Sequence, residues 1–168
     1  MIARKEEIMG KKSVRPNKNL YMTSRESLDL TREEAAELTG ISADRLEKIE
    51  NEKSLPHPDE VLMMAKYYKN PSINNYFCSH ECPIGQQYVP AIPKKELSQI
   101  VLEMLASLNN MNREKERLIE ITADGKIGDD ELEDFHNIQE QLSKISASVE
   151  SLRLWVEEMI AKGHISKV

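Results

Sequence analysis

Residues 31–51 decide how the first part of the chain folds, and they read TREEAAELTGISADRLEKIEN. Glu34 follows Thr31 by three residues, which is the spacing of a capping box at the start of a helix. Gly40 predicts the end of that helix, because glycine readily adopts the left-handed conformation that a helix C-terminus needs. The segment therefore begins with a short, capped helix.

A second helix is expected directly after the first. Ser42 can cap it, and Leu46 and Ile49 lie three residues apart on its apolar face. Two helices joined by a short turn that contains glycine form the helix-turn-helix arrangement. This geometry lays the second helix in the major groove of DNA, so the segment predicts a DNA-binding function.

The composition agrees with a helical fold. The chain has 168 residues, of which 39% are hydrophobic, 31% charged and only 5% aromatic. This balance favours helices over strands and predicts an all-α protein. No apolar run reaches the roughly 18–20 residues that a membrane span needs, and residues 1–20 lack the apolar stretch of a secretory signal. We therefore expect a cytoplasmic protein with no membrane partner.

The charge is unevenly distributed along the chain. The formal net charge is -6, but residues 1–18 contain six basic and two acidic residues. Residues 1–17 are therefore interpreted as a basic arm that helps to hold a polyanion such as double-stranded DNA. The alternative is that this segment is a disordered, solvated tail.

Residues 18–77 resemble the phage-repressor family of helix-turn-helix domains, also described as xenobiotic-response-element or Cro/repressor-like. The resemblance is carried by residues 24–36, 40–42 and 46–51. It implies a lambda-repressor-like domain of five helices that usually acts as a dimer and mostly regulates transcription. The recognition helix would extend from Ser42 to Lys53.

The resemblance also assigns individual residues. It implies an ion pair between Arg25 in the first helix and Glu50 at the end of the recognition helix. It places Arg32 against a DNA phosphate. The residues that it places at base edges, at the DNA backbone or near the same face are Ser42, Ala43, Asp44, Arg45, Lys48, Asn51 and Lys53.

Three departures from the family pattern affect this interpretation. Asp29 and Glu52 stand where glycines are common, which predicts a strained backbone near Asn51. Ala35 replaces a larger core residue. Residues 43–53 contain four acidic and three basic side chains, which on balance repel phosphate. The alternative is therefore a helix-turn-helix domain that serves as a protein-interaction module.

Residues 78–94 are predicted to form a linker, because prolines and a glycine interrupt them. Cys78, His80 and Cys82 are three soft ligands that could hold zinc or another thiophilic metal, with His57 or a second subunit completing the site. The alternatives are a pair of reduced thiols or a reversible disulfide. No metal or other cofactor is needed for DNA binding, and the metal or redox sensor is kept as an alternative function.

Residues 95–168 are predicted to form a long antiparallel helical hairpin like a coiled coil. Their apolar residues repeat at heptad spacing in two segments of about 25 and 33 residues. The positions are Leu97, Val101, Met104, Leu108, Met111 and Leu118, then Phe135, Ile138, Leu142, Ile145, Val149, Leu152, Val156 and Met159. One hairpin would leave much of this stripe exposed, which predicts that it pairs with a second copy.

These features together predict a homodimeric, sequence-specific regulator of transcription of the bacterial type. No glycine-rich phosphate loop or catalytic arrangement of side chains is recognisable, so an enzyme is not expected. The main alternative is a non-enzymatic adaptor, antitoxin-like or phage-derived, whose hairpin binds another protein or an effector.

Overall fold

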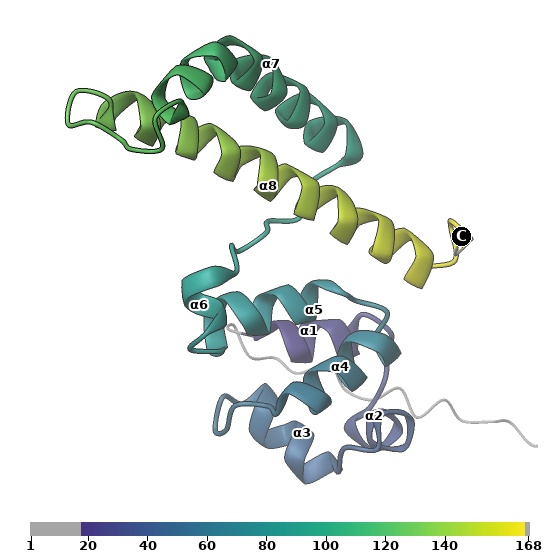
Figure 1. The fold of residues 1–168 in the computed structure, drawn as a ribbon. Helices are drawn as coiled ribbons and strands as arrows, with labels where there is room; N and C mark the ends of the chain where they lie inside the picture. Colours follow the sequence, from purple (N-terminus) through teal and green to yellow (C-terminus); the bar gives the residue numbers. More distant parts are fainter. Residues whose placement is uncertain (1–17, 167–168) are drawn as a thin grey trace, which may run out of the picture. The chain divides into compact units, whose positions relative to one another are not determined.

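The structure is a computed structural model that describes residues 18–166, and all regular elements in that range are helices (Figure 1). The prediction of an all-α fold is confirmed. The chain divides into two compact units, Met1–Ala91 and Ile92–Val168. The basic arm predicted for residues 1–17 lies outside the described residues. None of the helices within 18–166 is long and apolar enough to cross a membrane.

The helices follow one another with short connections. The first unit contains α1 (Leu20–Glu26), α2 (Arg32–Thr39), α3 (Ala43–Glu50), α4 (Pro58–Tyr67), α5 (Ser72–Tyr76), the π-helix η1 (Phe77–Glu81) and α6 (Gly85–Tyr88). The second unit contains α7 (Leu97–Thr122) and α8 (Leu132–Ala161).

The predicted start and end signals of α2 and the predicted start signal of α3 are confirmed. The Thr31 hydroxyl accepts from the Glu34 N–H, and the Glu34 carboxylate accepts from the Thr31 N–H, which completes the capping box. Gly40 ends α2 in the left-handed conformation, with φ of 74°. Ser42 caps α3 by accepting from the Arg45 N–H. Regular α3 ends at Glu50, three residues before the predicted end of the recognition helix.

One apolar cluster forms the core of the first unit. Helices α2, α3, α4 and α5 all contribute to it, and α1 contributes Tyr21. The buried members are Tyr21, Ala35, Ile41, Leu46, Ile49, Val61, Met64, Ala65, Tyr68 and Ile73. Leu46 and Ile49 are at most 1% exposed, so the predicted buried face of α3 is the one that anchors it.

Most of the segment that was predicted as a linker, residues 78–94, is part of the first unit in the structure and is partly helical. Residues up to Ala91 belong to the first unit, and η1 and α6 continue the chain directly after α5. The Cys82 N–H donates to the Phe77 carbonyl at 2.9 Å, so a π-turn continues the helical backbone up to the residue before Pro83. A Cβ on Gly85 would lie 2.0 Å from the Cys78 carbonyl oxygen. Glycine therefore permits a close approach that fixes α6 against η1.

Helices α7 and α8 run side by side in opposite directions and contact each other along the hairpin (Figure 1). They contain 26 and 30 residues, close to the predicted lengths. The residues that the hairpin buries are Ile100, Ser107, Ile121, Ile138, Ser148, Ser151 and Glu158. Of the predicted apolar seam, Ile138 is buried and eight further residues are half-buried, whereas Leu97, Val101, Leu108, Leu142 and Val149 are exposed.

The predicted seam and the buried row coincide only in part. Heptad spacing alone does not separate two adjacent rows that have the same period. The buried row contains three large isoleucines as well as three small serines, and the five exposed apolar side chains of the predicted seam lie beside it. The prediction of a hairpin is therefore confirmed, and its contact row was predicted in part.

Candidate nucleic-acid interface

The outer face of α3 carries the residues that the sequence assigned to base contacts. Ser42, Asp44 and Lys48 are exposed, and Ala43 is half-buried. Within residues 18–166, the side chains of Asp44 and Lys48 form no hydrogen bond or ion pair. Leu46 and Ile49 hold the opposite face in the core. The buried face fixes the orientation of α3, so its short row of polar residues remains on the surface of the domain.

Glu50 stabilises the C-terminal end of α3 through two arginines. Its carboxylate accepts from Arg25 Nε at 2.6 Å and Nη2 at 2.9 Å, and from Arg32 Nε at 2.8 Å. The Glu50 side chain is 1% exposed, so this is a buried, fully paired carboxylate. Burial alone lowers the pKa of Arg25, but the hydrogen bonds to Glu50 raise it more, and the guanidinium stays charged. The structure thus brings Arg25, Glu50 and Arg32 together.

Arg32 has a structural role in addition to the phosphate contact that the sequence assigned to it. Its Nε is committed to Glu50, while 31% of its side chain is exposed. It is the first residue of α2, so it lies where a helix N-terminus can face a phosphate. Both roles are compatible, because only one edge of the guanidinium is used inside the domain.

Arg45, which the sequence assigned to DNA contacts, is bonded to other residues of the domain. It donates to the Glu60 carboxylate at 2.8 and 2.7 Å, to Ser54 Oγ at 2.7 Å and to the Leu55 carbonyl at 2.8 Å. The hydrogen bonds from Arg45 to the Glu60 carboxylate are the main cause of a lowered Glu60 pKa. Arg45 therefore joins α3 to the following loop and to α4. The sequence analysis missed this role, because it depends on Glu60, fifteen residues further along the chain.

Lys53 and Asn51 both donate to the carboxylate of Glu47 at 3.1 Å. The Lys53 hydrogen bond is the main cause of a lowered Glu47 pKa. With Glu50 buried against arginines and Glu47 paired, Asp44 and Glu52 remain the other acidic side chains of the segment. The repulsion expected between this helix and phosphate is thus partly compensated within the domain.

The strained backbone predicted near Asn51 is confirmed. Glu52 has φ of 58° and Asp29 has φ of 55°, so both non-glycine residues adopt the left-handed conformation. Lys69 does so as well, with φ of 53°. At Glu52 this conformation lets the Lys53 N–H reach the Lys48 carbonyl at 2.8 Å, as in a Schellman C-cap. The tight turn keeps Lys53 beside α3.

The three soft ligands Cys78, His80 and Cys82 lie on and directly beside η1. Cys78 and Cys82 are free, half-buried thiols. The His80 ring stacks on Tyr76 with centroids 4.8 Å apart, and its Nδ1 lies 2.8 Å from Ser79 Oγ. Over residues 18–166, no group of three His, Cys, Asp or Glu side chains is arranged to hold a metal ion.

The comparison with protein families agrees with this geometry. The helix-turn-helix family model matches residues 23–72, which is less than a third of the chain and lies within the segment that contains α1 to α5. No curated protein and no solved structure gives a match. Members of this family are DNA-binding regulators of transcription and are not typically enzymes. Residues 23–72 therefore form a helix-turn-helix domain of the lambda repressor/Cro-like type.

Proposed function

We propose that the protein is a sequence-specific regulator of transcription that binds double-stranded DNA as a homodimer. The observation that carries the proposal is the exposed polar row of α3, on a domain that matches a DNA-binding family. Helix α3 would enter the major groove with Ser42 and Asp44 at its leading end.

Each exposed residue of this row suits a particular contact. Asp44 can accept a hydrogen bond from cytosine N4, and Ser42 can bond to several base edges. Lys48 can donate to guanine or to a phosphate, and the exposed edge of Arg32 can donate to a phosphate. The acidic residues near α3 lower the nonspecific part of the affinity, so the basic residues 1–18 would supply much of it.

The dimer would form through one side of the hairpin. Val101 and Leu108 on α7 each follow a buried residue by one position. Leu142 and Val149 on α8 likewise follow Gln141 and Ser148, which face α7. One residue advances a helix by about 100°. Because the two helices run in opposite directions, the same rotation brings all four exposed side chains to the same side of the hairpin.

The α7 part of this apolar side carries almost no charge. Between residues 97 and 112, Glu103 is the sole charged residue, and it is paired with Lys95. An uncharged, leucine-rich side is suited to meet a copy of itself across a twofold axis. Two hairpins would then form a four-helix bundle, and the two recognition helices would address a palindromic site.

Selection from a random double-stranded DNA library at two salt concentrations tests the DNA part of the proposal. Wild type should enrich a palindrome, and Lys48→Ala should lose it. Lys144→Ala on α8 is the matched control and should keep it, because Lys144 is paired with Glu140 on the hairpin. Absence of any enriched motif with wild type at both salt concentrations would contradict sequence-specific binding.

Sedimentation tests the dimer separately. Wild type should sediment as a dimer, and Leu142→Glu should sediment as a monomer because it places a charge on the apolar side. Glu140→Gln, two residues away and exposed, should remain dimeric. A monomeric wild type would favour the adaptor, in which a different protein covers this side of the hairpin.

A further inference from the structure

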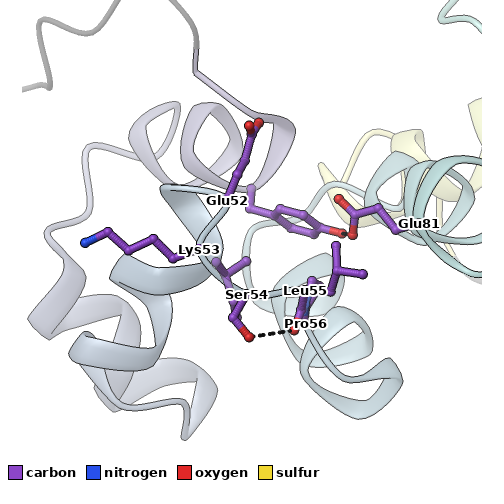
Figure 2. Close-up of a pocket in the computed structure, with 8 residues that line it drawn as sticks. Glu52, Lys53, Ser54, Leu55, Pro56 and Glu81 are labelled. Atoms are coloured by element: carbon purple, nitrogen blue, oxygen red, sulfur yellow. Dashed lines mark hydrogen bonds between the residues drawn. The ribbon is translucent and has the colours of Figure 1, made fainter.

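A small pocket lies inside the first unit, beside the C-terminal end of α3 (Figure 2). Its volume is about 220 Å³. The loop that follows α3 forms one wall, and α1 and η1 form the other. The lining residues are Tyr21, Ile49, Glu52, Lys53, Ser54, Leu55, Pro56 and Glu81.

The polar wall is built on a carboxylate that is only partly compensated. Glu81 Oε2 accepts from the Tyr21 hydroxyl at 2.7 Å, and Tyr21 is buried. Glu81 Oε1 accepts no hydrogen bond from any residue in 18–166. Burial and, to a smaller degree, the nearby Glu52 carboxylate raise the pKa of Glu81 despite the Tyr21 hydrogen bond. A positively charged group in the pocket would therefore stabilise the ionised carboxylate of Glu81.

No cation of the described residues is bonded to this carboxylate. Lys53 lines the pocket, but its amine pairs with Glu47 at 3.1 Å and extends away from Glu81 in Figure 2. The Arg45 guanidinium donates to the loop at Ser54, but its charge is paired with Glu60. The His80 ring is stacked on Tyr76. The partner for Glu81 is thus not supplied by its charged neighbours.

The remaining wall is apolar. Ile49 and Pro56 are buried, whereas Leu55 is 61% exposed beside the pocket. A bare inorganic cation would leave this apolar surface in water. The volume is also smaller than the roughly 300 Å³ at which pockets for drug-sized ligands begin. These properties together select a ligand of a few carbon atoms with one positive charge.

We propose that this pocket binds a small primary alkylammonium ion, with the ammonium group on Glu81 and the alkyl chain against Leu55 and Pro56. The loop that would hold the ligand is bonded to α3 through Arg45, which donates to Ser54 Oγ and to the Leu55 carbonyl. The ligand would thus lie next to the recognition helix. Any effect on DNA affinity rests on the proposed function, whereas the binding itself does not.

The test uses the full chain without DNA, so its result is independent of the proposed function. The methyl signals of Leu55 and Ile49 are followed by NMR during titration with n-butylammonium chloride. In parallel titrations, 1-butanol supplies the chain without the charge, and ammonium chloride supplies the charge without the chain. Only n-butylammonium should give saturable shifts.

Two variants and a control complete the experiment. Glu81→Gln should weaken n-butylammonium binding at least tenfold, because the amide can still accept from Tyr21 but carries no charge. Leu55→Lys should weaken it similarly by placing a cation beside the pocket. Glu33→Gln on α2 should bind as wild type does. Equal shifts with 1-butanol, or undiminished binding by Glu81→Gln and Leu55→Lys, would overturn the proposal.

Discussion

The two units of this protein differ in how completely each buries its own apolar residues. The helix-turn-helix unit gathers ten buried apolar residues from five helices into one cluster. The hairpin fully buries three isoleucines, Ile100, Ile121 and Ile138, although its two helices are much longer. A hydrophobic core stabilises in proportion to the apolar area that it removes from water. The first unit therefore carries its own core, and the hairpin leaves part of its core unfinished.

The two units also differ in how their buried polar groups are hydrogen-bonded. In the first unit, Glu50 is buried against two arginines that fix the ends of α2 and α3. In the hairpin, the hydroxyls of Ser107, Ser148 and Ser151 donate to carbonyls four residues earlier in their own helices. These serines let the helices approach without joining them. The buried carboxylate of Glu50 thus joins distant parts of the first unit, whereas the buried serines of the hairpin bond only within their own helices.

Removing the buried carboxylate should have the largest effect. Glu50→Ala leaves two arginines without their partner, and breaking a buried pair in this way costs about 3–5 kcal/mol. Urea unfolding of the first unit should show this loss. Glu150→Ala is the control, because it removes an exposed partner of Arg153 and should change stability little. A loss no larger than that of the control would show that the pair is not structural.

Truncating one isoleucine in each unit measures the difference between the two cores. Ile73→Ala and Ile138→Ala remove the same group from sites that are at most 1% exposed, and each should cost about 3 kcal/mol. The loss at Ile138 should depend on protein concentration if hairpins pair, whereas the loss at Ile73 should not. Thermal unfolding over a hundredfold range of concentration checks this. Identical behaviour of both variants would argue against pairing.

Relieving the backbone strain after α3 should give a smaller, opposite effect. Glu52→Gly should stabilise the first unit by up to about 1 kcal/mol, because glycine adopts the positive φ without steric cost. Glu52→Ala removes the same charge but keeps the Cβ, so it should not gain this stability. The difference between the melting temperatures of these two variants isolates the backbone effect. If both variants melt together, the left-handed turn is not strained.

The smallest effects should be two pH dependences of opposite sign. Burial raises the pKa of Glu81. The loss of folding stability that comes from ionising this buried carboxyl is therefore absent below the usual carboxyl pKa, and it grows as the pH rises through the raised pKa. Glu81→Gln should therefore be more stable than wild type at neutral pH and lose this advantage in acid. Denaturant midpoints between pH 3 and pH 7 measure the difference, and an advantage that is independent of pH would contradict it.

Glu158 in the hairpin should show the reverse. Burial raises its pKa, but hydrogen bonds from Lys162 and Lys94 lower it more, and Lys94 Nζ lies 2.6 Å from the carboxylate. The stability that it contributes is present above the usual carboxyl pKa and is lost as the pH falls through the lowered one. Glu158→Gln should thus be less stable than wild type at neutral pH, and the two should converge in acid.

The sequence predicted the parts of the fold that depend on local interactions. The Thr31 and Glu34 capping box, the Gly40 stop and the Ser42 cap each involve residues a few positions apart. Their bonds form within a single turn of chain, so spacing alone identifies them. The strained backbone at Glu52 was predicted as well, but from the family resemblance, because glycine is common at this position in the family.

Features that depend on distant residues were missed. Arg45 was assigned to DNA because it lies on α3, but Glu60 and Ser54 determine where its guanidinium goes. The prolines near Cys82 suggested a linker, yet packing at Gly85 keeps this segment in the first unit. Ser148 was not among the predicted contact residues, because heptad spacing was read from apolar residues alone, yet it is buried in the hairpin.

The uncharged apolar side of the hairpin has a consequence for how such a regulator would respond in a cell. At low concentration, the amount of dimer rises with the square of the amount of free monomer. Occupancy of an operator would therefore change steeply with the rate at which the chain is synthesised. A threshold in gene expression would follow from copy number alone, before any effector is bound.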